Sequence, residues 1–131
     1  MKTIAVRLTD GEDVFMSIKR ITEKQKIEAG VILSGVGSLK TSNIRVPVIN
    51  GEVKYINPID LEIDALHGTV SKNGCHVHIT VSDREGHAWG GHMKEGCIVR
   101  TTCELVIGIL DETRFERIQD PQTGFEELKI L

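Results

Sequence analysis

Apolar and polar side chains alternate at every second position in several segments, and this pattern most limits what the chain can fold into. The clearest case is the segment 59–65, where Ile59, Leu61 and Ile63 are separated by acidic residues. Successive side chains of a β-strand point to opposite faces of the sheet, so the alternation predicts strands with one buried and one solvent face. Further strand candidates are the segments 3–8, 31–33, 66–71, 75–82, 101–110 and 128–131.

One segment near the N-terminus has a helical period instead. Asp13 can cap a helix, Gly30 is expected to end it, and between them apolar residues recur at Val14, Ile18, Ile21 and Ile27. One early helix followed by many strands predicts an α+β fold with an antiparallel-dominated β-sheet and one main helix. The length of 131 residues suits one domain that spans residues 1–131.

Turn residues separate the strand candidates at short intervals. Asn50-Gly51 between the segments 44–48 and 52–56 is a strong hairpin signal, and Pro47 favours an edge position for the first of them. Lys72-Asn73-Gly74 turns the chain into the segment 75–82. These short connections are the reason to expect antiparallel pairing rather than parallel crossovers.

The charge balance argues against an autonomous DNA-binding module. The chain has 19 acidic and 16 basic residues, a net charge of −3, whereas such modules usually carry a basic patch. The one basic cluster comprises Lys19, Arg20, Lys24 and Lys26. Glu23 and Glu28 lie among these residues, a pattern typical of a solvated helix face. We therefore expect the chain to bind DNA weakly and without sequence specificity at best.

The sequence contains neither a membrane-spanning segment nor a signal peptide, and this bears on the cellular compartment. There is no apolar run of the roughly 20 residues that cross a bilayer, and the first residues lack the apolar region of a signal peptide. We therefore expect a cytoplasmic protein with no membrane partner. The three cysteines, Cys75, Cys97 and Cys103, are expected to be packed thiols rather than disulfides.

Four of the five histidines lie between Cys75 and Cys97. His76 and His78 are two residues apart in a strand candidate, so both rings should project from one face, while Val77 and Ile79 face the other. A turn at 83–86 can bring the chain back and deliver His92 from a Gly-Gly-His sequence. Three neighbouring imidazoles suit zinc or a similar divalent ion, although this spacing alone leaves a metal-free packing role open. His67 and His87 are weaker candidates.

The segment 34–38 contains Gly35 and Gly37, followed by Ser38. Two glycines could let backbone N–H groups hold an anion, which makes Gly35, Gly37 and Ser38 a candidate ligand loop. No nucleotide-binding fingerprint is complete, however. The favoured alternative is a tight segment that another part of the backbone approaches closely.

These motifs together resemble the plants and prokaryotes conserved (PPC) domain, in the form of a stand-alone prokaryotic member. The likeness is carried, in family order, by Arg7-Leu8 with Gly11-Glu12-Asp13, by the segments 34–39 and 66–71, by His76-x-His78, by Gly90-Gly91-His92-Met93, and by the segment 96–104. It covers nearly the whole chain. The resemblance implies a homotrimer, a zinc site at His76, His78 and His92, and a label of DNA binding that comes from the family alone. Glu104 occupies a family position and is a candidate to lie just outside the metal ligands; its alternative is an ion pair with Arg7 or Arg100.

Three classes of function remain open at this point. The first is an assembly or regulatory module that forms a trimer and binds metal, with other protein partners unspecified. The second is a metal-dependent, hydrolase-like enzyme that uses an open three-histidine site, for which no nucleophile and base pair is evident. The third is a sensor of a small ligand or anion.

Overall fold

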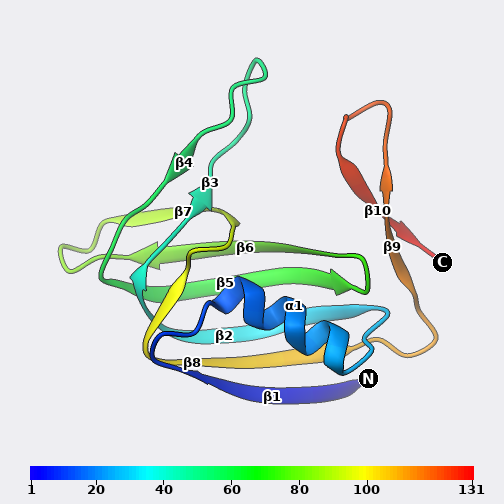
Figure 1. Cartoon of the computed structure of the whole chain (residues 1–131), viewed down its shortest axis with the longest axis horizontal. Coiled ribbons are helices and arrows are strands. Elements are labelled where there is room, and N and C mark those ends of the chain that lie inside the picture. Colours follow the sequence, from blue (N-terminus) through cyan, green and yellow to red (C-terminus); the bar gives the residue numbers. More distant parts are fainter.

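The computed structural model describes all of residues 1–131, and most of the chain lies in one twisted sheet (Figure 1). Eight strands form this sheet in the order β1-β8-β2-β5-β6-β7-β3-β4, and every neighbouring pair is antiparallel. Their bounds are β1 Lys2–Thr9, β2 Gly30–Thr41, β3 Ile44–Arg45, β4 Tyr55–Ile56, β5 Leu61–Ser71, β6 Gly74–Ser82, β7 Ala88–Met93 and β8 Ile98–Ile109. The predicted α+β architecture is confirmed.

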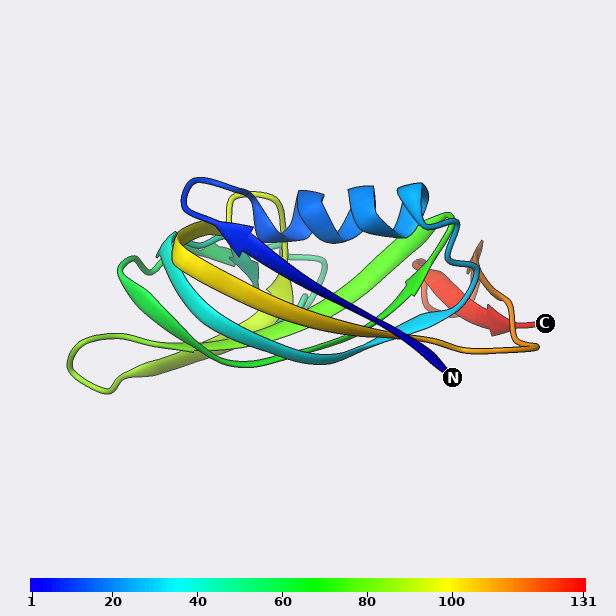
Figure 2. The same ribbon diagram turned by 90° about the horizontal axis from the view of Figure 1, so that it is seen from below.

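A single helix, α1 (Val14–Lys24), lies across one face of the sheet (Figure 2). As predicted, Asp13 caps it, because the Asp13 side chain accepts a hydrogen bond of 2.9 Å from the backbone N–H of Met16. The predicted end at Gly30 is wrong: the helix ends at Lys24, Lys26 adopts a positive φ of 53°, and Gly30 begins β2. No helix in the chain is long and apolar enough to cross a membrane.

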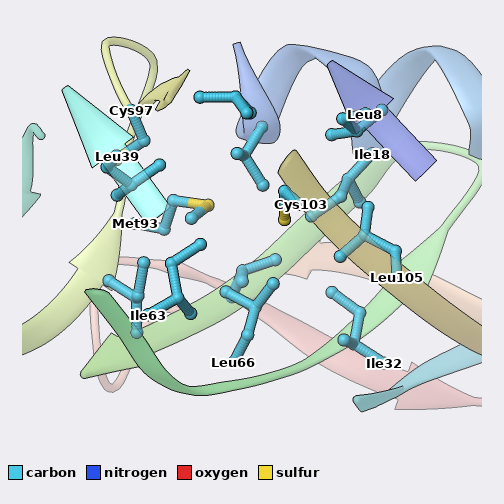
Figure 3. Packing of buried hydrophobic residues seen from close by; sticks show 14 of the residues in the cluster. Leu8, Ile18, Ile32, Leu39, Ile63, Leu66, Met93, Cys97, Cys103 and Leu105 are labelled. Carbon is cyan, nitrogen blue, oxygen red and sulfur yellow. The ribbon is translucent and has the colours of Figure 1, made fainter. Parts of the chain in front are cut away.

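The core lies between α1 and the face of the sheet that the helix covers. Figure 3 shows Ile18 from the helix among Leu8, Cys103 and Leu105 from the strands. The buried residues are mainly Ile, Val and Leu, as the scarcity of aromatic residues predicts. Cys97 and Cys103 are fully buried and free, and burial raises the pKa of each thiol to about 11. The expectation of packed thiols is confirmed for these two.

Two segments extend beyond the main body of the sheet (Figure 1). The first, which we call the arm, comprises residues 44–56 and ends in the predicted hairpin turn, where Asn50 and Gly51 have φ of 53° and 74°. The second, the C-terminal hairpin, pairs β9 (Phe115–Gln119) with β10 (Glu126–Ile130) apart from the main sheet. The predicted strand at the C-terminus is confirmed, in a separate two-stranded sheet.

The glycine-rich segment is strand rather than loop, which corrects the ligand-loop interpretation of Gly35, Gly37 and Ser38. All three lie inside β2, where the register against β8 shifts three times. A Cβ atom on Gly35 would lie 2.5 Å from the Leu66 side chain, and one on Gly37 would lie 2.1 Å from the Thr102 carbonyl oxygen. The Ser38 hydroxyl donates to the Arg100 carbonyl at 2.7 Å. Close approach of neighbouring strands explains the glycines, as the favoured alternative stated.

A substitution of Gly37→Ala should therefore destabilise the fold. The new methyl group would press on backbone atoms of β8 that cannot move independently, and we expect a loss of roughly 1–3 kcal/mol in the free energy of unfolding. Urea unfolding measures it. Glu85→Ala, at an exposed side chain on the turn after β6, is the control and should cost well under half as much. Equal losses for the two variants would contradict this role for Gly37.

Candidate metal centre

Three histidines meet on the face of the sheet opposite α1. In β6, Val77, Ile79 and Val81 are buried against the core, so the alternating His76 and His78 are exposed on the other face. Asp83 closes the following turn, since its Oδ1 accepts from the backbone N–H groups of Glu85 and His87 at 3.0 and 2.9 Å. The returning strand β7 then pairs directly opposite β6.

The cross-strand register completes the cluster. His92 on β7 is the partner of His78 on β6, and paired residues project from the same face. Gly91 precedes His92, and a Cβ atom there would lie 2.7 Å from the Arg45 carbonyl oxygen, so the glycine lets β3 approach β7. The Gly-Gly-His sequence thus positions a histidine where two strands come close together.

The geometry of the three rings suits one small cation. The Nε2 atoms of His76 and His78 are 3.1 Å apart, and ligand atoms of all three residues lie within 4.8 Å of one another. A tetrahedral zinc ion with Zn–N bonds of about 2.0–2.1 Å needs N···N separations of about 3.3 Å. The cluster could therefore hold a metal after movements of the rings by about 1 Å or less.

The surroundings of two of the rings, His76 and His92, favour the neutral imidazole that a metal requires. Burial, and then the nearby Arg45 guanidinium, lower the pKa of His92 from 6.5 to about 4. Burial and the neighbouring His78 lower the pKa of His76. Metal binding needs neutral imidazoles, so these two rings need not lose a proton near neutral pH.

This shift predicts a pH dependence for the metal-free protein. His92 of the unfolded chain takes up a proton near pH 6.5, whereas the folded protein resists it down to about pH 4. Protons thus favour unfolding across this window, and the thermal midpoint measured with a chelator should fall between about pH 7 and pH 5. His92→Gln removes the titrating ring and should show a smaller fall. An identical fall in that variant would contradict the contribution of His92.

The remaining candidates lie outside the triad. His67 is the register partner of His78 on β5 and is exposed on the same face, so it borders the cluster without joining it. His87 is on the turn, with its side chain 71% exposed and its ring 3.3 Å from Asp83. Cys75 faces the helix side, beside Phe15, Lys19 and Thr22. Cys75 was expected to point away from His76, and its position on the helix side agrees with this expectation.

Glu104 does not adjoin the triad within one chain. It lies on β8, which β2 and β5 separate from β6, a distance of about 14 Å at the usual strand spacing. It is the register partner of Arg7 but forms no ion pair, because Arg7 donates to the Thr102 hydroxyl and Arg100 pairs with Asp60. Glu104 was expected just outside the metal ligands, and it lies elsewhere; sequence spacing does not indicate the order of strands in the sheet.

Three cations around the triad were not singled out from the sequence. Arg45 on the arm, Lys94 after β7 and Arg117 on the C-terminal hairpin line a cleft of about 600 Å³ together with the three histidines. Lys94 follows His92 by two residues, a spacing that could have indicated it. Nothing in the sequence indicates Arg45 or Arg117, because each comes to the site through long-range pairing.

Comparison with known proteins places these features in a family. The profile of the Plants and Prokaryotes Conserved (PCC) domain matches residues 1–111. A curated relative, the bifunctional protein GlmU of Synechococcus sp. strain JA-2-3B'a(2-13), is 39% identical over 99% of this chain. The chain spans about a fifth of the length of the curated relatives it matches, 20% in this case.

Solved structures share the whole fold. A hypothetical protein from Salmonella enterica has a TM-score of 0.91 at 35% identity, with 99% of this chain and 93% of that chain covered. A metal-containing protein from Archaeoglobus fulgidus has a TM-score of 0.84 at 28% identity, with 98% and 94% covered. A candidate DNA-binding protein from Bacteroides thetaiotaomicron has a TM-score of 0.87 with 97% and 91% covered, but at 21% identity it supports the fold alone.

Proposed function

The chain belongs to the Plants and Prokaryotes Conserved (PCC) domain family, and from this premise we propose that it is a metal-binding assembly domain. In this proposal His76, His78 and His92 hold one zinc ion per chain, and three chains form a homotrimer that acts as a binding or regulatory module. The observation that carries the proposal is the convergence of three imidazoles, two of them with lowered pKa values, on one exposed sheet face.

The choice of zinc rests on the donor set. Imidazole nitrogen suits zinc and other borderline divalent ions, and no carboxylate lies within the cluster of ligand atoms that would favour magnesium or calcium. Three protein ligands leave a fourth position of a tetrahedral ion for water or an anion. The metal-containing relative from Archaeoglobus fulgidus is consistent with this choice.

The homotrimer is proposed from the uncovered face of the sheet. Leu33 and Val36 on β2 are 44% and 57% exposed on the face opposite α1. Met1, Val31 and Leu33 gather around Gly108 on that face, where a Cβ atom would touch all three side chains. Contiguous apolar surface of this kind marks interaction sites, of which a contact with another subunit is one kind, and the triad lies on the same face.

Native mass spectrometry tests both parts of the proposal at once. Protein purified without chelators should give a trimer of 14.5 kDa chains that carries one zinc ion per chain. The same preparation after dialysis against a chelator is the control for adventitious metal. A monomer at micromolar concentration would overturn the assembly, and a fully metal-free chain that does not take up added zinc would overturn the metal centre.

DNA binding is expected to be weak for this domain alone. Arg20 in the basic cluster already pairs with Glu12, and Lys19 lies over the Phe15 ring, so neither projects freely toward a phosphate. A trimer would triple the net charge of −3 and further oppose a polyanion. Titration of duplex DNA at two salt concentrations should show only weak affinity. Submicromolar affinity near physiological salt, with a steep salt dependence, would contradict this expectation.

A further inference from the structure

The cleft over the histidine triad contains more positive charge than its own carboxylates neutralise. Its walls come from the sheet, the arm and the C-terminal hairpin, and it has a volume of about 600 Å³. Arg45, Lys94 and Arg117 line it, and none of the three forms an ion pair with a carboxylate of this chain. Glu126 and Glu127 line the hairpin side but cannot balance these cations and a divalent ion together.

Arg45 flanks the triad on the side of the arm. It is the register partner of His92 on the adjacent strand, so its side chain rises from the same sheet face as the histidine rings. It is half-buried, and it lines the cleft together with His92 and Lys94. The strand pairing therefore places Arg45 beside His92, and Lys94 follows His92 by two residues.

Arg117 flanks the triad on the opposite side. Its guanidinium donates to the Thr69 hydroxyl at 2.9 Å, and Thr69 is the register partner of His76. Asn73 fixes the backbone of Arg117 through two hydrogen bonds, of 3.0 and 3.1 Å. The guanidinium is therefore held beside the triad rather than free in solvent, with donor groups left over for a ligand.

We infer that this cleft binds a small organic oxyanion, a carboxylate or a phosphate, between the triad metal and the two arginines. Arg45 and Arg117 would donate hydrogen bonds to the oxygens of the ligand, and a metal held by His76, His78 and His92 would offer it a further positive charge. Guanidinium groups match both kinds of oxyanion with paired donors. Pro47, Val48 and Phe125 offer apolar surface in the same cleft for the remainder of the ligand. This inference rests on the metal centre proposed above.

Titration calorimetry on the zinc-loaded trimer, freed of unbound metal, tests the inference with inorganic phosphate and with succinate as probes. At least one probe should bind, and the stronger of the two identifies the ligand class. Arg45→Met and Arg117→Met should each weaken that binding by roughly 10- to 100-fold, the effect of losing a charged hydrogen bond. Arg84→Met removes the same charge on the exposed turn outside the cleft and should change binding by less than about twofold.

Zinc content and thermal midpoint, measured on every sample, separate the possible failures. A zinc-loaded wild-type protein that binds neither probe overturns the oxyanion site and leaves the metal centre intact. Binding that Arg45→Met and Arg84→Met weaken equally also overturns it, because the cleft would then contribute only general charge. A protein that takes up no zinc overturns the metal centre, and the metal-bridged ligand with it. If Arg117→Met lowers the thermal midpoint, Arg45→Met decides the outcome, because Arg45 lines the cleft and forms no ion pair within this chain.

Discussion

The double variant His78→Ala, His92→Ala should lose its zinc almost entirely. Two of three protein ligands disappear, and the ring of His76 alone cannot compete with water for a divalent ion. Because loss of a single group that merely orients a metal ligand already costs about 10- to 100-fold in affinity, we expect a loss of at least about 100-fold. Metal analysis after gel filtration, and competition with a chromophoric chelator, measure this loss.

Two histidines of the same chain serve as matched controls. His87 is exposed on the turn and paired with Asp83, so His87→Ala should keep one zinc ion per chain. His67 borders His78 without belonging to the cluster, and His67→Ala should also keep the ion. Full zinc occupancy in the double variant would rule out His78 and His92 as ligands, and loss of zinc in His67→Ala would show that His67 is one.

The second large effect is expected from charges placed on the uncovered sheet face. Leu33→Glu together with Val36→Glu should convert the proposed trimer to 14.5 kDa monomers, because each buried contact would have to desolvate a carboxylate. Stable interfaces bury about 800 Å² per partner with a core depleted of charge, so two charges per subunit are disruptive. Light scattering coupled to gel filtration reports the mass directly.

The helix side provides the control for this experiment. Met16 on α1 is 38% exposed, and Met16→Glu introduces a carboxylate on the opposite side of the molecule. That variant should remain a trimer with an unchanged circular dichroism spectrum. If the Leu33, Val36 double variant also remains a trimer, subunits do not meet through this face, and the exposed apolar residues of the arm, such as Ile49 and Val53, become the next surface to test.

Local periodicity accounts for how much of the fold could be predicted. The alternation of Val77, Ile79 and Val81 with His76 and His78 specified which side chains face the core, because this property depends only on the pleat of one strand. The capping Asp13 and the Asn50-Gly51 turn are likewise local. The predicted helix end at Gly30 is wrong because the apolar pattern continues past Lys24 to the buried Ile27, which lies in the connecting segment.

Residues placed by long-range pairing could not be predicted in the same way. From the sequence alone, a ligand-binding loop and a close backbone contact are both possible for the segment 34–38. The structure decides between them, because Thr102 on β8 lies against Gly37 on β2. The sequence also allows Glu104 to lie near the histidines, but in the sheet β2 and β5 lie between its strand and β6. Sequence spacing indicates which residues form a strand and does not indicate which strands are adjacent, so it left the ligand loop open as an alternative and did not place Glu104.

The sequence by itself determined the α+β class, the strand that carries His76 and His78, and the approach of His92 through a short turn. Each of these depends on backbone geometry over a few residues, which composition and spacing specify. Only the tertiary structure decided that Arg45 and Arg117 stand on opposite sides of the triad, and that one sheet face is left uncovered. Those features depend on strand order and on how the arm and the C-terminal hairpin pack, which are set by the total burial of apolar surface across the whole chain.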